Sequence, residues 1–220
     1  MPGTNVGCGI TEWLFPDNVS QSTIDGRTSS NACTFIALCF GSNYHQSSLP
    51  TPAVGQPLSL PWKEAVIKAI RTGNQIYDES IEGNGIYNVA VDDAVIACHV
   101  HGLVVEILHE YDVFGENPVS QFAEVINSIL QQKRSFHVLV AKDKTMMIIV
   151  DDNGTLIFID SHMHGHSGAL VARSDPYQGQ QAQSFSTWVN QMLNKSHSVG
   201  LSICSLTTVT FEQKENVDTI

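Results

Sequence analysis

The segment 135–160, SFHVLVAKDKTMMIIVDDNGTLIFID, decides the expected fold of this chain. It contains three runs of β-forming residues, separated by Lys142-Asp143-Lys144 and by Asp152-Asn153-Gly154. Asn-Gly is a strong signal for a tight hairpin, and the β-branched and aromatic residues around it favour strands. The segment therefore predicts an antiparallel meander of three strands. Near the end of the chain, LTTVTFE (206–212) predicts a closing strand.

Most of the predicted helices precede this sheet. Residues 32–40 are apolar on all sides and follow Ser29-Ser30-Asn31, which are good N-cap residues, so we expect a buried helix that Gly41 ends. Further helices are predicted from apolar residues at helical spacing, and they start at Trp62, cover 91–98, follow Asn117-Pro118 and surround 185–192. A helical part followed by a mainly antiparallel sheet predicts an α+β fold.

The length of 220 residues fits one domain, and we expect a single domain over 1–220 that could also be part of a longer protein. Residues 1–20 are rich in turn-forming residues and are expected to be irregular. The segment 41–61 predicts a long loop that borders a site, and 212–220 a disordered tail.

The net charge of −11 disfavours binding to nucleic acid or to an anionic membrane surface. The sequence shows no secretory signal and no apolar run long enough to span a bilayer. Its five cysteines are scattered and odd in number, which indicates neither a disulfide framework nor a zinc ribbon. These features predict a cytoplasmic protein, and we expect a monomer without a cofactor or metal.

The first candidate site residues are Asp160 and His162, at the end of the last meander strand. Side chains two positions apart on a strand share a face, so this carboxylate and this imidazole are expected to meet. A carboxylate that orients a histidine and raises its basicity has the role of the third member of a catalytic triad. Alone, the pair is also compatible with a purely structural strand end.

Cys33 is the second candidate because it opens the predicted buried helix. The free N–H groups and positive dipole at a helix N-terminus favour a thiolate. The chain's Cys39, Cys98 and Cys204 lie in apolar surroundings, where cysteine is most often a small core residue. Cys33 precedes His162 by about 130 residues, a spacing of the kind found in cysteine proteases of papain type.

The stretches SSNACTFIAL (29–38) and FIDSHMHGHSGALVA (158–172) resemble the papain-like deubiquitinases of the herpesvirus large tegument protein and their cellular and bacterial relatives. In that family a helix-opening cysteine is combined with a strand-end Asp-x-His. The resemblance implies a papain-like fold and cleavage after the C-terminal glycine of ubiquitin, the implied partner. It maps the nucleophile to Cys33, the base to His162 and the orienting acid to Asp160. Gln21 in VSQSTIDG is the nearest candidate for an oxyanion donor.

Other readings of these residues stay open. His162, His164 and His166 alternate beside Asp160 and could form a catalytic zinc site, although Gly165 disfavours an extended geometry there. A papain-like scaffold could also bind ubiquitin without cutting it, or transfer an acyl group to another acceptor.

Two further groups of residues receive weaker assignments. Acidic side chains in the middle of the chain could pair with the arginines of a ubiquitin-like tail, or could simply be solvated: Glu79, Glu82, Asp92 and Asp93. His99 and His101 are left without a role.

Overall fold

A computed structural model describes residues 1–47, 49–80, 87–176 and 179–212 of the chain. Within these residues the strands are β1 (Thr4–Gly7), β2 (Ile10–Leu14), β3 (Val105–Phe114), β4 (Ser135–Ala141), β5 (Lys144–Val150), β6 (Leu156–Asp160), β7 (Leu170–Ser174) and β8 (Ile203–Phe211). The α-helices are α1 (Cys33–Gln46), α2 (Leu60–Ser80), α3 (Val91–Val100), α4 (Pro118–Ile129) and α5 (Gln181–His197). The α+β prediction is confirmed.

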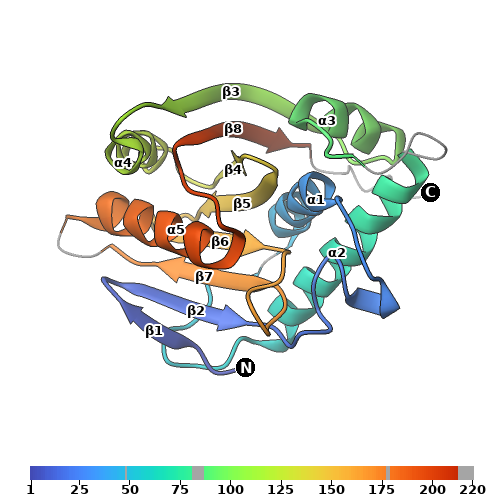
Figure 1. The fold of residues 1–220 in the computed structure, drawn as a ribbon, viewed down its shortest axis with the longest axis horizontal. Helices are drawn as coiled ribbons and strands as arrows, with labels where there is room; N and C mark the ends of the chain where they lie inside the picture. Colours follow the sequence, from blue (N-terminus) through green and yellow to red (C-terminus); the bar gives the residue numbers. More distant parts are fainter. Residues whose placement is uncertain (48, 81–86, 177–178, 213–220) are drawn as a thin grey trace, which may run out of the picture.

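The strands form one antiparallel sheet in the order β1-β2-β7-β6-β5-β4-β8-β3 (Figure 1). The predicted meander is β4-β5-β6, and the predicted closing strand, β8, pairs with β4 at its other edge. These four strands are therefore central in the sheet. The helices predicted from 62, 91, 117 and 185 are all present as well.

Both faces of the central sheet are buried. On β6, Ile157 and Ile159 belong to one hydrophobic core, which α1, α2 and α3 cover, whereas Leu156 and Phe158 belong to the other, which α4 and α5 cover. Figure 1 shows α1 and α2 packed at one side of the sheet and α4 and α5 at the other. Burial on two faces explains why these strands read as continuous apolar runs. It also places the end of β6 between helices from both layers.

The helix that begins at Cys33 does not end at Gly41 as the sequence predicts, but continues to Gln46. Gly41 is buried inside it, and a Cβ there would lie 2.6 Å from Phe211 and 2.8 Å from Met147. The glycine thus permits close packing of α1 on the sheet rather than ending the helix. The loop expected over 41–61 is therefore shorter, because it begins only after Gln46 and ends before Leu60.

The N-terminal segment is not irregular as expected, because β1 and β2 lie in it. β2 pairs with β7, and Ile10, Thr11 and Trp13 are buried. Pairing with a distant strand therefore overrides the turn-rich local composition. Of the tail expected over 212–220, residues 213–220 lie outside the described part. In the described ranges no helix is long and apolar enough to cross a membrane.

Gly73 of α2 lies in close contact with Ile36, in the first turn of α1. A Cβ at this position would lie 2.7 Å from both Cα and backbone N of Ile36, which cannot move without shifting α1. We therefore expect Gly73→Ala to lower the free energy of unfolding by about 1–3 kcal/mol, the usual cost of overpacking, in denaturant titrations.

The control is Glu64→Ala, on the exposed part of the same helix. It is expected to change the free energy of unfolding by less than about 0.5 kcal/mol. A Gly73→Ala protein as stable as the wild type would show that the two helices are not in this close contact.

Candidate active site

Asp160, the last residue of β6, is fully buried and is hydrogen-bonded to His162. Its Oδ1 accepts the backbone N–H of His162 at 2.9 Å and is 2.6 Å from the ring Nδ1. The pair meets as expected, but in a turn after the strand rather than through alternation along it. Because Nδ1 faces the carboxylate, the other ring nitrogen of His162 is left for a second partner.

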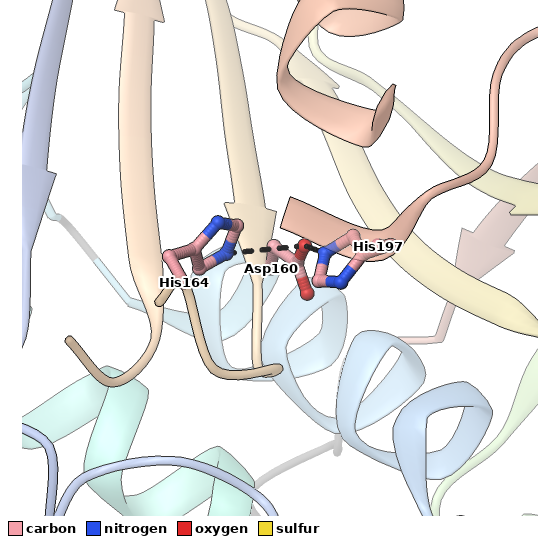
Figure 2. Close-up of side chains that lie close together, drawn as sticks. All are labelled: Asp160, His164 and His197. Carbon is pink, nitrogen blue, oxygen red and sulfur yellow. Dashed lines mark hydrogen bonds and ion pairs between the residues drawn. The ribbon is translucent and has the colours of Figure 1, made fainter. Parts of the chain in front are cut away.

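The other oxygen of Asp160 faces two more histidines. Oδ2 lies 2.9 Å from Nε2 of His197, the last residue of α5, and 3.2 Å from Nε2 of His164. Figure 2 shows the two imidazole rings on opposite sides of the carboxylate. The carboxylate is thus fixed by contacts on both oxygens, which leaves Oδ1 directed at His162.

Cys33 is the first residue of α1 and is only 3% exposed. Burial would raise the pKa of its thiol, but the hydrogen bond and charge of His162, with hydrogen bonds from Thr145 of β5, outweigh burial and lower it. The charge and hydrogen-bonding effect of His162 on the Cys33 thiol indicates that these two sequence-predicted residues lie near each other, and His162 is hydrogen-bonded to Asp160.

The pKa of His162 is raised and that of Asp160 is lowered. Burial would lower the pKa of His162, but the charge and hydrogen bond of Asp160, together with Cys33, raise it to about 10. Burial would raise the pKa of Asp160, but His162, His164 and His197 hold it well below its usual range. These opposite shifts favour a thiolate beside an imidazolium.

This protonation state predicts unusual reactivity of Cys33. Because its pKa is lowered, the thiolate persists at lower pH than in ordinary thiols, so we expect iodoacetamide to alkylate Cys33 at lower pH than a free cysteine. In His162→Ala the remaining effect of burial raises the pKa, so the midpoint of the rate profile should move to higher pH. Mass spectrometry of the Cys33 peptide across pH measures both profiles.

Cys8 serves as an internal control for the alkylation, because its thiol is exposed whereas that of Cys33 is buried. Its profile should be the same in both proteins. A Cys33 midpoint in the wild type that equals or exceeds that of free cysteine would contradict the thiolate assignment.

Gln21 joins the segment before Cys33 to the turn that carries His162. Its Nε2 donates to the carbonyl oxygen of Ser30 at 2.9 Å, and its Oε1 accepts the hydroxyl of Ser161 at 2.9 Å. Asn74 of α2 donates to the carbonyl oxygen of Gln21 and accepts the hydroxyl of Ser30. The side chain expected to bind an oxyanion is therefore held by a buried network at the site, and its Nε2 keeps a second hydrogen for another acceptor.

The three alternating histidines are not brought together as one zinc site. The chain turns at Gly165, which has a φ of 63°, and His164 and Ser167 pair across the turn. His162 contacts Oδ1 of Asp160, His164 lies beside Oδ2, and His166 is exposed.

Other candidate residues lie away from this site. Burial raises the pKa of the Cys39, Cys98 and Cys204 thiols, to about 12 for the latter two, as expected for core cysteines. His99 Nε2 is hydrogen-bonded to the backbone of Val105, and His101 is paired with Glu79. Of the acidic set, Glu79, Asp92 and Asp93 are exposed, and Glu82 lies outside the described residues.

Sequence reasoning missed His197, Asn74 and Thr145. His197 lies on α5 and Asn74 on α2, and only the packing of these helices brings them to the site. A polar asparagine in the buried stripe of an otherwise amphipathic helix was a usable signal for Asn74. No local pattern distinguishes His197 or Thr145.

Comparison with known proteins supports the fold. No protein-family model and no curated protein sequence matches the chain. Among solved structures, it is similar to the ubiquitin-specific protease encoded by murine cytomegalovirus tegument protein M48, with a TM-score of 0.63 and 10% identity over 94% of this chain and 89% of that one. The Pseudomonas avirulence protein AvrPphB matches with a TM-score of 0.49 and 11% identity over 83% and 95% of the two chains. The papain-like fold predicted from the tegument-protease resemblance is thus confirmed.

Proposed function

We propose that this chain is a cysteine protease that cleaves peptide and isopeptide bonds after the C-terminal glycine of ubiquitin. The observation that carries the proposal is the buried hydrogen bond between Asp160 and His162, together with the effect of His162 that lowers the pKa of the Cys33 thiol. A helix N-terminus and an oriented histidine are conditions that make a cysteine nucleophilic.

Two observations support ubiquitin as the substrate. The viral protein of the same fold is described as ubiquitin-specific and was solved with a ubiquitin-based suicide substrate. In addition, Cys33 is 3% and His162 is 7% exposed. Such restricted access favours a substrate tail without side chains next to the cleaved bond, which the Gly-Gly end of ubiquitin provides.

In the proposed first half-reaction, His162 holds the proton of the Cys33 thiol and the thiolate attacks the glycyl carbonyl carbon. A C–S bond forms, and the carbonyl π electrons move onto oxygen. The backbone N–H of Cys33 and the Nε2 of Gln21 are the proposed donors to that oxyanion, a kind of interaction for which removal of one donor costs about 3 kcal/mol.

The tetrahedral intermediate then collapses, and His162 gives its proton to the leaving amine as the C–N bond breaks. In the second half-reaction neutral His162 accepts a proton from water, whose oxygen attacks the thioester carbonyl. The C–S bond breaks, which restores the thiolate beside a protonated His162 and releases the C-terminal carboxylic acid of ubiquitin, whose proton then passes to solvent. Asp160 keeps the ring oriented through both steps.

The direct test is hydrolysis of a fluorogenic amide on the C-terminus of full-length ubiquitin. We expect turnover of this substrate, and none of the same amide on a ubiquitin whose penultimate glycine is replaced by alanine, because the covered site excludes a side chain there. The rate on the same amide of an unrelated ubiquitin-like modifier, compared with the rate on the ubiquitin amide, measures how selective the chain is for ubiquitin.

Binding must be measured in the same experiment to separate the alternatives. Wild-type protein that binds ubiquitin but hydrolyses neither the amide nor an isopeptide-linked diubiquitin would be a binding module. Release of the fluorophore together with transfer of ubiquitin to an added amine in preference to water would indicate an acyltransferase.

A further inference from the structure

The Oδ2 side of Asp160 carries a group of ligand atoms that the proposed protease reaction does not use. Oδ2, His164 Nε2 and His197 Nε2 all lie within 4.8 Å of one another. His162 occupies only the opposite oxygen, Oδ1. Figure 2 shows that the three side chains converge from the end of β6, the turn after it and the end of α5.

His164 is the unusual member of this group. Its side chain is 5% exposed, and its Nε2 has no hydrogen-bond partner among the described residues, although it lies 3.2 Å from Asp160 Oδ2. Its Nδ1 is 3.0 Å from Ser196 Oγ. In the tautomer that donates from Nδ1 to Ser196, the lone pair of Nε2 faces a carboxylate oxygen. A cation between these two acceptors would satisfy both, whereas in the other tautomer Nε2 carries the proton and points it toward Oδ2.

A cavity lies beside His164, one member of this group. It has a volume of about 330 Å³, and its lining includes His164, Gly165 and Ser196. The cavity is large enough for several waters, so an ion can approach the group from the side of His164.

We propose that Asp160 Oδ2, His164 Nε2 and His197 Nε2 form a binding site for a divalent transition-metal ion, best suited to Zn²⁺. Two imidazole nitrogens, one carboxylate oxygen and an open position for water make a donor set that zinc uses in proteins. Tetrahedral zinc with bonds of about 2.0–2.1 Å separates its ligand atoms by about 3.4 Å. The two contacts to Oδ2, at 2.9 and 3.2 Å, need to widen by only a few tenths of an ångström.

The surroundings of the ligands fit this role. Ser196 contacts the nitrogen of His164 that faces away from the ion, as outer-shell partners of metal-bound histidines do. On binding, the proton that His197 Nε2 donates to Asp160 is released to solvent. The ion then links the end of β6, the following turn and the end of α5, so it should raise the unfolding temperature.

The test uses untagged full-length protein with Cys8→Ser and Cys33→Ala, which removes the exposed thiol and the nucleophile as alternative ligands. We expect one Co²⁺ per chain with the visible absorption of a four-coordinate site, displaced by Zn²⁺. His164→Asn or His197→Asn in this background should weaken binding at least tenfold. His166→Asn, an exposed histidine of the same turn, is the matched control and should bind like the background.

Equal binding by His164→Asn and the background would overturn the proposal, and so would binding that disappears once Cys8 and Cys33 are replaced. If the asparagine variants do not fold, X-ray absorption at the zinc edge of the background protein decides: two imidazoles and oxygen ligands support the site, and sulfur or a single imidazole overturns it. These measurements are independent of protease activity, so they stand or fall separately from the proposed function.

Discussion

Replacing Cys33 with alanine is expected to reduce hydrolysis of the ubiquitin amide to background, a loss of about 10⁵-fold or more, as for other catalytic nucleophiles. The methyl group fits the space of the thiol but cannot form the thioester. Ubiquitin binding should persist, because Cys33 is covered and contributes little contact surface. Initial rates and a binding titration on the same preparation measure the two effects.

Cys8→Ala is the matched control, since Cys8 is exposed and lies outside the site. It should leave the rate within twofold of the wild type. Hydrolysis by Cys33→Ala above one per cent of the wild-type rate, in a protein whose unfolding transition is unchanged, would show that another residue carries the reaction.

Asp160→Asn is expected to lower the hydrolysis rate by about 10⁴-fold, the size of effect seen when the orienting acid of a triad becomes an amide. The substitution removes the negative charge that raises the pKa of His162. In the wild type, His162 contacts Oδ1 of Asp160 and His197 contacts Oδ2. An asparagine has only one acceptor oxygen, so it cannot accept a hydrogen bond from both histidines in this way. The thiolate therefore loses its stabilising imidazolium near neutral pH, and the pH dependence of Cys33 alkylation should shift to higher pH in the same variant.

The control for this substitution is Asp152→Asn, an exposed aspartate paired with Arg134. Its rate should remain within twofold of the wild type because exposed ion pairs contribute little. An Asp160→Asn protein that folds and loses less than tenfold in rate would mean that the carboxylate does not orient the base.

The parts of the fold that the sequence predicts correctly are those with a local physical signal. The meander strands are buried on both faces, which makes them long apolar runs, and Asp152-Asn153-Gly154 separates the last two. The contact of Asp160 with His162 is likewise local, because the residues are two positions apart. The start of α1 at Cys33 follows from the change from polar to apolar composition.

The features that sequence reasoning missed depend on segments far apart in the chain. β2 becomes a strand because β7 pairs with it, and Gly41 stays helical because Phe211 packs against it. His197 reaches Asp160 because α5 covers the face of the sheet on which Asp160 lies. None of these partners can be identified from periodicity or composition, since each contact is decided by packing.

The most direct measurement is the reaction of the wild-type chain with a ubiquitin that carries an electrophile at its C-terminus, followed by mass spectrometry of the adduct. We expect one ubiquitin per chain, attached to Cys33, and no adduct with Cys33→Ala or after the protein is unfolded. An adduct on Cys8, Cys39, Cys98 or Cys204, or one that survives the Cys33 substitution, would contradict it.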